Sequence, residues 1–527
     1  MSKKDRILDT LLYYGYFSEY LPIEFTTVDF KKLKKISVSS TSTKPYFYTM
    51  NKNETSLERR TISIPEIGSF VNTIKYLDSS LVINKFLSLT DSNENSLSKI
   101  FTREGKVRAF ANPYLDPLVL SEKIRDSDDF ISNTIFKLRK AFGSKGILKL
   151  DIANFYGSFY THNIASIGHD SVWAEEKYQD AQNGNSDQEY KVLKGLDSQI
   201  GFLNQKRTHG LLIGPLLSYV IAESLMATID SELNRELSNS LGTKTNFVRF
   251  MDDYDVFIKN ESSIPLIIAT FTKVLERYGF VLNDSKTEYK PFPYYVYEDF
   301  SQSIHTDKEE ISSRDLLTIY SKLSNHEKQK TQKGGLYFLS TNIHHLTNKT
   351  NFNESISILL STIRMNAKSI PSSCKSILNI YQNYKENIEV HEIFDNIFEY
   401  LLECTEKNYE WETIWLIYTL IKIERDLFSA RLSVILKMKL DDLSLIIIVN
   451  ELLLNQANLD DIKSLLTKQS WLLNYELYRL EIITDEELRT FTDDDSLFNN
   501  FQIMKSKAVI LYHKYKKKGE HEPPFIV

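Results

Sequence analysis

The spacing of hydrophobic residues divides the chain into a mixed first part and a helical second part. Up to about residue 300, short apolar runs of strand length alternate with stretches in which apolar residues recur every three or four positions. The strands expected there are 59–65, 106–113, 146–152 and 280–282. The helices expected there are 6–20, 114–142, 211–225 and 264–278. Polar stretches that predict loops or linkers lie at 36–57, 91–99 and 183–187.

Beyond residue 300 the pattern becomes almost purely helical, and strand signals are nearly absent. The helices expected there are 356–365, 376–384, 390–402, 411–423, 443–454, 462–480 and 497–515. Serial helices with short polar joints suggest an α-solenoid or an irregular bundle, which is HEAT-like only in a loose sense. Because 527 residues exceed one ordinary core, we expect two domains, 1–300 and 301–527.

Cysteine usage and hydropathy predict a cytoplasmic protein with no membrane contact. Cys374 and Cys404 give neither a disulfide framework nor metal-ligand spacing. The charged N-terminus, residues 1–5, does not resemble a signal peptide, and the longest apolar run, 443–454, is too short to span a bilayer.

Charge is distributed unevenly around a net value of −6. Residues 1–150 carry 24 Lys and Arg against 17 Asp and Glu, or +7, while residues 151–300 carry 13 against 21, or −8. Residues 301–527 carry 27 against 32, or −5. A basic first lobe beside an acidic centre suits a polymerase, which needs cations for phosphates and carboxylates for metals. Ordinary surface variation is the alternative.

The candidate chemistry begins with Asp252 and Asp253 in the stretch 250–255, which lies between the strand-forming residues 246–249 and 256–258. Burying two adjacent carboxylates is costly unless a cation joins them, so we expect a metal-binding hairpin. Asp151, at the end of the apolar strand 146–152, is the candidate third carboxylate, although such residues are often helix caps or turn residues. Carboxylates from two strands can hold two Mg²⁺ ions about 3.5–4 Å apart, the arrangement used for nucleotidyl transfer.

Two further features are consistent with a nucleotide site. Tyr156 follows Asp151 by five positions and could lie beneath a nucleotide sugar, where it would exclude a 2′-hydroxyl; core packing is the alternative. Gly210 and Gly214 precede Pro215 at the start of a predicted helix, where glycines let the backbone approach a ligand closely. A plain loop-to-helix turn is the more usual reason for glycines in such a pattern.

In this order the motifs resemble the fingers and palm of reverse transcriptases over roughly residues 10–290. More narrowly, Asp-Ile-x-Asn-Phe-Tyr-x-Ser-x-Tyr-Thr-His at 151–162 and Gly-Tyr-Phe-x-x-x-Leu-Pro at 15–22 are similar to the abortive-infection (Abi) group of bacterial defence reverse transcriptases. The resemblance implies an α+β fold for 1–300, with an antiparallel palm sheet and helices. It implies an all-α, HEAT-like domain over 301–527 and no conventional thumb.

The resemblance also implies roles for particular residues. The catalytic residues would be Asp151, Asp252 and Asp253, and the metal positions would be these three and Ile152. The cofactor would be Mg²⁺, two ions per site, with Mn²⁺ as a substitute. The nucleotide-binding residues would be Arg60, Arg108, Tyr156, Gly214 and Lys286. The arginines would grip the triphosphate as fork donors and the lysine would stabilise the leaving pyrophosphate; solvated surface side chains are the alternative.

Two departures from the retroviral pattern bear on the reaction. Phe250 replaces the usual Tyr before Met-Asp-Asp, and Ile213 stands where retroviral-type enzymes have a polar Gln in the glycine-rich loop. The change at Phe250 should be tolerated. Ile213 and the lack of a thumb-like segment after residue 290 favour the activity of the Abi group, which is untemplated, protein-primed DNA synthesis. The candidate priming hydroxyls are those of Tyr13, Tyr14, Tyr16, Tyr20, Tyr512 and Tyr515, each of which also suits a core or surface position.

The sequence therefore predicts a DNA polymerase acting on dNTPs in antiphage defence, in the bacterial cytoplasm. The DNA product would be attached covalently to the protein, and the helical surface suggests a homo-oligomer. The first alternative is an RNA-templated reverse transcriptase that uses a noncoding RNA. The second is a non-catalytic helical scaffold that binds a phage or host protein.

Overall fold

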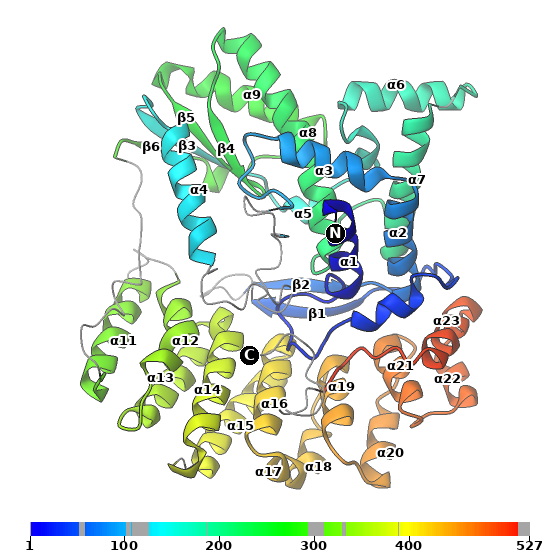
Figure 1. Ribbon diagram of the computed structural model, residues 1–527, viewed down its shortest axis with the longest axis vertical. Coiled ribbons are helices and arrows are strands. Elements are labelled where there is room, and N and C mark those ends of the chain that lie inside the picture. Colours follow the sequence, from blue (N-terminus) through cyan, green and yellow to red (C-terminus); the bar gives the residue numbers. More distant parts are fainter. Residues whose placement is uncertain are drawn as a thin grey trace.

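The computed structural model describes residues 2–51, 58–101, 107, 126–185, 187–293, 310–328, 334–387 and 389–514. Figure 1 shows an α/β region, coloured blue to green, above a row of helices that runs from green-yellow α11 to red α23. At this coarse level the structure agrees with what the resemblance implies, which is an α/β part followed by a helical C-terminal region.

The palm sheet is antiparallel, with strand order β4 (Phe247–Phe250), β5 (Asp253–Ile258), β3 (Gly146–Asp151), β6 (Glu288–Pro291). Side chains of neighbouring positions alternate between its faces. Val256 joins the main core with residues of α8 (Leu216–Leu241) and α9 (Ile264–Glu276), while Phe257 joins a small second cluster that includes Ala141, just after α4 (Asp126–Lys140). The sheet is therefore covered by helices on both faces.

A second, two-stranded sheet pairs β1 (Tyr46–Asn51) with β2 (Arg59–Ile64). The prediction of a loop over 36–57 was therefore wrong for β1. Its alternate residues Tyr48 and Met50 are 0% and 4% exposed, and Tyr48 lies opposite Ile62 in the register. The β-propensity of these aromatic and apolar side chains outweighs the polar composition around them.

The helix predicted over 6–20 ends early, because α1 covers only Lys3–Tyr13. The chain turns at Gly15, whose carbonyl accepts a hydrogen bond of 2.8 Å from Leu216 N. A Cβ atom at Gly15 would lie 2.8 Å from Leu216 Cβ, so only glycine allows this close approach to α8.

Two other predictions in this part are corrected or limited. Instead of a strand over 280–282, the structure has one bridge, between Ile152 and Leu282. Most of the predicted strand 106–113 and the first part of the predicted helix 114–142 lie outside the described residues. The remaining helices of the α/β region are α2 (Ile67–Ser79), α3 (Val82–Ser92), α5 (Phe155–Ser158), α6 (Ser171–Gln182) and α7 (Gln188–Leu203).

The helical region runs from residue 313 to residue 506. Its helices are α11 (Ser313–Lys328), α12 (Gly335–Leu346), α13 (Phe352–Met365), α14 (Ile370–Tyr384), α15 (Val390–Glu406), α16 (Glu410–Ile423), α17 (Arg425–Ala430), α18 (Leu432–Ile435), α19 (Asp442–Glu451), α20 (Gln456–Ser464), α21 (Trp471–Arg479), α22 (Asp485–Phe491) and α23 (Asp495–Ser506). Successive helices such as α13 and α14, or α15 and α16, pack against each other.

Two helices of this region differ from the prediction. The stretch 462–480 is two helices, α20 and α21, separated by a break at 465–470. The stretch 497–515 stops being helical at Ser506, and the chain then returns to the α/β region, where Tyr512 forms a bridge with Phe25. Among the described residues, none of the helices combines the length and the apolar character that crossing a lipid bilayer requires.

The helical region is joined to the first part of the chain by partly buried hydrogen bonds and an ion pair. The indole Nε1 atoms of Trp411 and Trp415 both donate to the carbonyl oxygen of Tyr20, at 2.7 and 2.8 Å. The Glu412 carboxylate pairs with Arg59 on β2. These contacts fix the segment around Tyr20 and the start of β2 against α16.

Candidate active site

Three carboxylates meet at one end of the palm sheet. The register of β3 and β5 places Asp151 directly opposite Asp253, and Asp252 lies in the turn between β4 and β5. Ile152 N donates a hydrogen bond of 3.2 Å to the carbonyl oxygen of Asp252, which ties the end of β3 to that turn. Residues about 100 positions apart in the sequence are thus brought together by strand pairing.

The electrostatics of this group indicate negative charge that is not fully balanced. Desolvation, a hydrogen bond to Asp151 and the charge of Asp252 together raise the pKa of Asp253 to about 7. Desolvation also raises the pKa of Asp252, with a further contribution from the charge of Asp151, against the opposing charges of Lys286 and Arg60. A bound cation would relieve this repulsion.

A lysine ammonium lies among the carboxylates. Lys286 Nζ donates to Asp151 Oδ1 at 2.9 Å, and Asn283 Nδ2 donates to Asp151 Oδ2 at 3.0 Å. Burial lowers the pKa of Lys286, but the hydrogen bond to Asp151 and the charges of Asp253 and Asp252 outweigh it and raise the pKa. Lys286 therefore lies against Asp151, and its role in nucleotide binding stays a prediction.

The same contacts bear on metal binding. Within the part of the chain that the structure describes, no group of three or more His, Cys, Asp and Glu side chains is arranged as a ready metal site. Both oxygens of Asp151 are instead taken by nitrogen donors. The donor set, three carboxylates with raised pKa values for Asp252 and Asp253, nevertheless fits a hard divalent cation such as Mg²⁺, which prefers oxygen ligands.

The glycine-rich loop connects the palm to β2. Leu211 N donates to the carbonyl oxygen of Tyr156 at 2.9 Å, and Ser63 N on β2 donates to the carbonyl oxygen of Ile213 at 2.7 Å. Gly214 has φ of 130°, and a Cβ atom there would lie 2.8 Å from the carbonyl oxygen of Ser63. Gly214 is therefore required for this close contact with β2.

The side chain of Ile213 is partly buried and packs against the main core. A residue in this position does not present its side chain freely to a nucleotide. The replacement of a Gln by Ile213 is thus weaker support for untemplated synthesis than the sequence suggested.

Arg60 and its neighbour Arg59 have different surroundings. Arg60 is exposed and interacts electrostatically with Asp252 and with Tyr156, a half-buried ring that packs on Phe155. Alternation along β2 turns Arg59 the other way, toward Glu412. Arg108, the other predicted triphosphate ligand, lies outside the described residues.

The candidate priming tyrosines fall into different environments. The buried hydroxyls of Tyr16 and Tyr512 donate to the carbonyl oxygen of Pro65 and to Glu451, at 2.6 and 2.8 Å. Tyr13 and Tyr14 lie beside Asp9 of α1. Tyr20 interacts electrostatically with Arg60 and with Tyr156, and Tyr515 lies outside the described residues.

The sequence reasoning missed the residues beneath the Asp252 turn. The prediction of a polar linker over 91–99 was wrong, because Asn95, Ser96 and Ser98 are buried and this segment runs beside β4. The small polar side chains of Ser96 and Ser98 form hydrogen bonds with buried groups rather than with solvent. A clue was Arg249, a charged residue in an otherwise apolar strand, which needs buried counter-charges.

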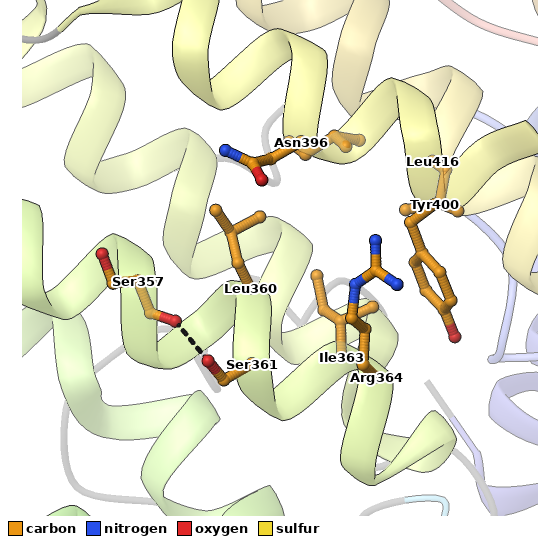
Figure 2. A pocket seen from close by; sticks show the side chains of 9 residues that line it. Ser357, Leu360, Ser361, Ile363, Arg364, Asn396, Tyr400 and Leu416 are labelled. Carbon is orange, nitrogen blue, oxygen red and sulfur yellow. Dashed lines mark hydrogen bonds between the residues drawn. The ribbon is translucent and has the colours of Figure 1, made fainter.

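A cavity of about 240 Å³ lies elsewhere, in the helical region between α13, α15 and α16. Figure 2 shows Arg364 facing the ring of Tyr400, with its guanidinium 4.7 Å from the ring centroid, beside Leu360 and Leu416. None of the candidate site residues lines it, and it is smaller than usual ligand pockets. The chemistry is therefore not located there.

Comparison with known proteins finds similar solved structures and one matching protein family. Three of the similar solved structures are telomerases. One from Candida albicans, in complex with a TWJ fragment of telomeric RNA, has 15% identity and a TM-score of 0.31, covering 75% of this chain and 64% of that one. One from Candida tropicalis, with the same kind of fragment, has 13% identity and a TM-score of 0.32, covering 76% and 64%. The apo telomerase from Candida tropicalis has 12% identity and a TM-score of 0.33, covering 81% and 76%.

The chain thus spans 64% of the length of the first two telomerase chains. No curated protein sequence matches this chain. Residues 121–295 match the family described as "Reverse transcriptase (RNA-dependent DNA polymerase)", and this range includes Asp151, Asp252 and Asp253. The chain therefore contains a reverse transcriptase domain over residues 121–295.

Proposed function

We propose that the protein is a DNA polymerase that joins deoxynucleotides at the Asp151, Asp252 and Asp253 cluster. The observation that carries the proposal is the register of β3 and β5, which sets Asp151 opposite Asp253 beside the Asp252 turn, inside the matched domain. We further propose two functional domains, with residues 1–300 as fingers and palm, and residues 301–527 as a helical domain in place of a thumb.

Each residue of the site has a role in this reaction. Bound divalent ions, two Mg²⁺ or Mn²⁺, would supply the positive charge that nucleotidyl transfer requires between carboxylates and phosphates. Asp151, Asp252 and Asp253 would hold them, with Ile152 at the end of β3. Arg60 is exposed beside Asp252, where its guanidinium can bind phosphate oxygens as a fork. Lys286 can stabilise negative charge on the leaving pyrophosphate.

The finer proposal is that synthesis is protein-primed and independent of a template. Among the described tyrosine candidates, Tyr20 is supported best, because its phenol interacts with Arg60 and Tyr156. In the priming step a bond forms between Tyr20 Oη and the α-phosphorus, the bond from that phosphorus to the bridging oxygen breaks, and pyrophosphate leaves. The phenolic proton passes to water. Burial raises the pKa of the Tyr20 hydroxyl to about 12, so positive charge such as that of Arg60 favours the reactive anion.

The proposed biological role rests on the two motifs at 15–22 and 151–162, which resemble the Abi group. They support antiphage defence by abortive infection in the bacterial cytoplasm, with a homo-oligomeric enzyme. Cells carrying the wild-type gene should resist phage, and cells carrying Asp252→Asn should not. Protection that survives this substitution would favour a scaffold over an enzyme.

The second candidate function is RNA-templated DNA synthesis, which is favoured by the description of the matched family as RNA-dependent. It predicts that product sequence follows an added or co-purified RNA and that nuclease treatment of the protein abolishes synthesis.

The experiment combines intact-mass analysis and peptide mapping after incubation with Mg²⁺ and each dNTP, with no template. We expect adducts of successive nucleotides on the protein. Tyr20→Phe should abolish the adduct. Tyr14→Phe, which removes one hydroxyl from a tyrosine beside Asp9 of α1, should retain it. An adduct that persists in Tyr20→Phe would assign priming elsewhere, and a strict need for RNA would favour the second candidate.

A further inference from the structure

The turn that carries Asp252 contains a residue in an unfavourable backbone conformation. Met251 has φ of 59°, in the left-handed region that residues with a Cβ atom avoid. It directly precedes Asp252, so its backbone sets the direction in which that carboxylate leaves the hairpin. Such a conformation persists only where the surroundings hold it.

Two buried side chains hold Met251 from both sides. Met251 N donates to Ser98 Oγ at 2.8 Å, and Arg249 Nη1 donates to the carbonyl oxygen of Met251 at 2.9 Å. Ser98 and Arg249 are both 0% exposed. Both partners are thus shielded by the core, while Met251 itself is only partly buried.

Glu223 of α8 fixes both of these side chains. Ser98 Oγ donates to Glu223 Oε2 at 3.1 Å, so its lone pairs can accept from Met251 N and from Arg249 Nη1. Arg249 donates to the same carboxylate through Nη1 and Nη2, at 2.9 and 3.1 Å. One buried carboxylate thus orients the donor and the acceptor that grip Met251.

A second carboxylate completes the network from the far side. Arg249 Nε donates to Asp230 Oδ2 at 2.9 Å, and the hydroxyl of Tyr254 on β5 donates to Asp230 Oδ1 at 3.0 Å. Arg249 N and O also pair with Asn95 O and Leu97 N, at 2.9 and 2.7 Å. Both strands of the catalytic hairpin are therefore anchored to α8 and to the segment 95–98.

We propose that Ser98, Arg249 and Glu223 are positioning residues that hold Met251 in its left-handed conformation and thereby aim the Asp252 carboxylate at Asp151 and Asp253. The proposal rests on the proposed function, because it assigns these side chains to the same cluster. None of the three touches the cluster itself; each acts through the backbone of Met251. Loss of the grip should lower affinity for the divalent cation and the rate of synthesis, while nucleotide affinity changes little.

The test measures Mn²⁺ binding to the full-length protein by electron paramagnetic resonance, together with kcat and KM for a dNTP. Ser98→Ala removes the partner of Met251 N, and we expect roughly 10- to 100-fold weaker Mn²⁺ binding, the usual cost of losing a residue that orients a metal ligand. We expect kcat to fall in parallel and KM to change by less than about threefold. Ser224→Ala is the matched control, since Ser224 is a buried serine of α8 that donates only to the Val220 carbonyl oxygen.

Rescue separates a role through Met251 from general support of the fold. Glycine adopts positive φ without strain, so Met251→Gly in the Ser98→Ala background should restore Mn²⁺ binding to within about threefold of wild type. If the double variant binds as weakly as Ser98→Ala, or if Ser98→Ala binds like wild type, the proposal is overturned. Where Ser98→Ala fails to fold, Glu223→Gln keeps the volume of the side chain and undergoes the same measurements. A wild-type protein that binds no Mn²⁺ would contradict the proposed function as well.

Discussion

Glu412 of α16 grips Arg59 of β2 through two hydrogen bonds, from Nη1 to Oε1 at 2.9 Å and from Nη2 to Oε2 at 2.5 Å. The Glu412 side chain is 1% exposed and that of Arg59 is 17% exposed, and the guanidinium lies over the ring of Tyr409, 4.3 Å from its centroid. The next residue on β2 is Arg60, whose charge acts on Asp252. The helical region therefore fixes the strand from which Arg60 reaches the site.

Breaking this pair should destabilise the contact between β2 and the helical region. In Glu412→Gln the largely buried guanidinium of Arg59 loses its negatively charged partner. We therefore expect the free energy of unfolding to fall by about 3 kcal/mol. Urea unfolding followed by tryptophan fluorescence reports it, because Trp411 and Trp415 lie at this contact. Asp493→Asn, which breaks the exposed pair with Lys468, is the control and should cost less than about 1 kcal/mol. Equal losses of unfolding free energy in the two variants would show that the buried pair stabilises the fold no more than the exposed pair does.

Arg60→Ala should weaken nucleotide binding. A charge-assisted hydrogen bond contributes about 1.5–3 kcal/mol, so KM for dNTPs should rise roughly 10- to 100-fold. Steady-state incorporation kinetics measure this. Arg364→Ala, at the cavity of Figure 2, removes an arginine away from the carboxylates and should leave KM unchanged. An unchanged KM in Arg60→Ala would place the triphosphate elsewhere.

Tyr156 should control sugar selection. Tyr156→Ala opens space beneath the sugar, and we expect the preference for dNTPs over rNTPs to fall by about tenfold or more. Tyr156→Phe keeps the ring and should keep the preference. The ratio of kcat/KM for a matched dNTP and rNTP measures both variants, and a preference that survives in Tyr156→Ala would show that this ring only packs the core.

Two adjacent carboxylates at the start of α19 should make stability depend on pH. Desolvation, with the charge of Glu410, raises the pKa of Asp441 from 3.8 to about 7, and desolvation with the charge of Asp441 raises that of Asp442 to about 7. The folded protein binds these protons more tightly than the unfolded chain does. Their contribution to the free energy of unfolding is therefore complete below about pH 4 and is lost as pH rises through 7. The side chain introduced by Asp441→Asn cannot ionise. The midpoint of urea unfolding of this variant should therefore exceed that of wild type by more at pH 8 than at pH 5. A difference that does not change with pH would contradict this account.

The parts of the fold that sequence patterns predicted are those with strong periodicity. The apolar strand before Asp151 and the hairpin around Asp252 were predictable, because short apolar runs flanked by carboxylates have few other interpretations. β1 was missed because its polar surroundings read as a loop, although Tyr48 and Met50 face the core.

The parts of the site that sequence patterns did not predict depend on tertiary partners. Ser98 lies in a stretch whose composition is that of a linker, and its burial depends on Glu223, 125 positions away. Likewise, no local pattern distinguishes Arg59 from Arg60. The resemblance alone pointed to Arg60, and the pairing of Arg59 with Glu412 depends on the packing of α16 against β2. Pairings of this kind are set by the packing of distant elements and leave no local signal.

The measurement that tests the central claim most directly is DNA synthesis by Asp252→Asn. Asparagine keeps the size of the side chain and removes the negative charge that cation binding at the carboxylate cluster needs. An unchanged melting temperature would show that the fold is kept. With Mg²⁺ and labelled dNTPs, wild-type protein should form DNA, and the variant should form at least about 100-fold less. Undiminished synthesis by Asp252→Asn would contradict the assignment of the active site.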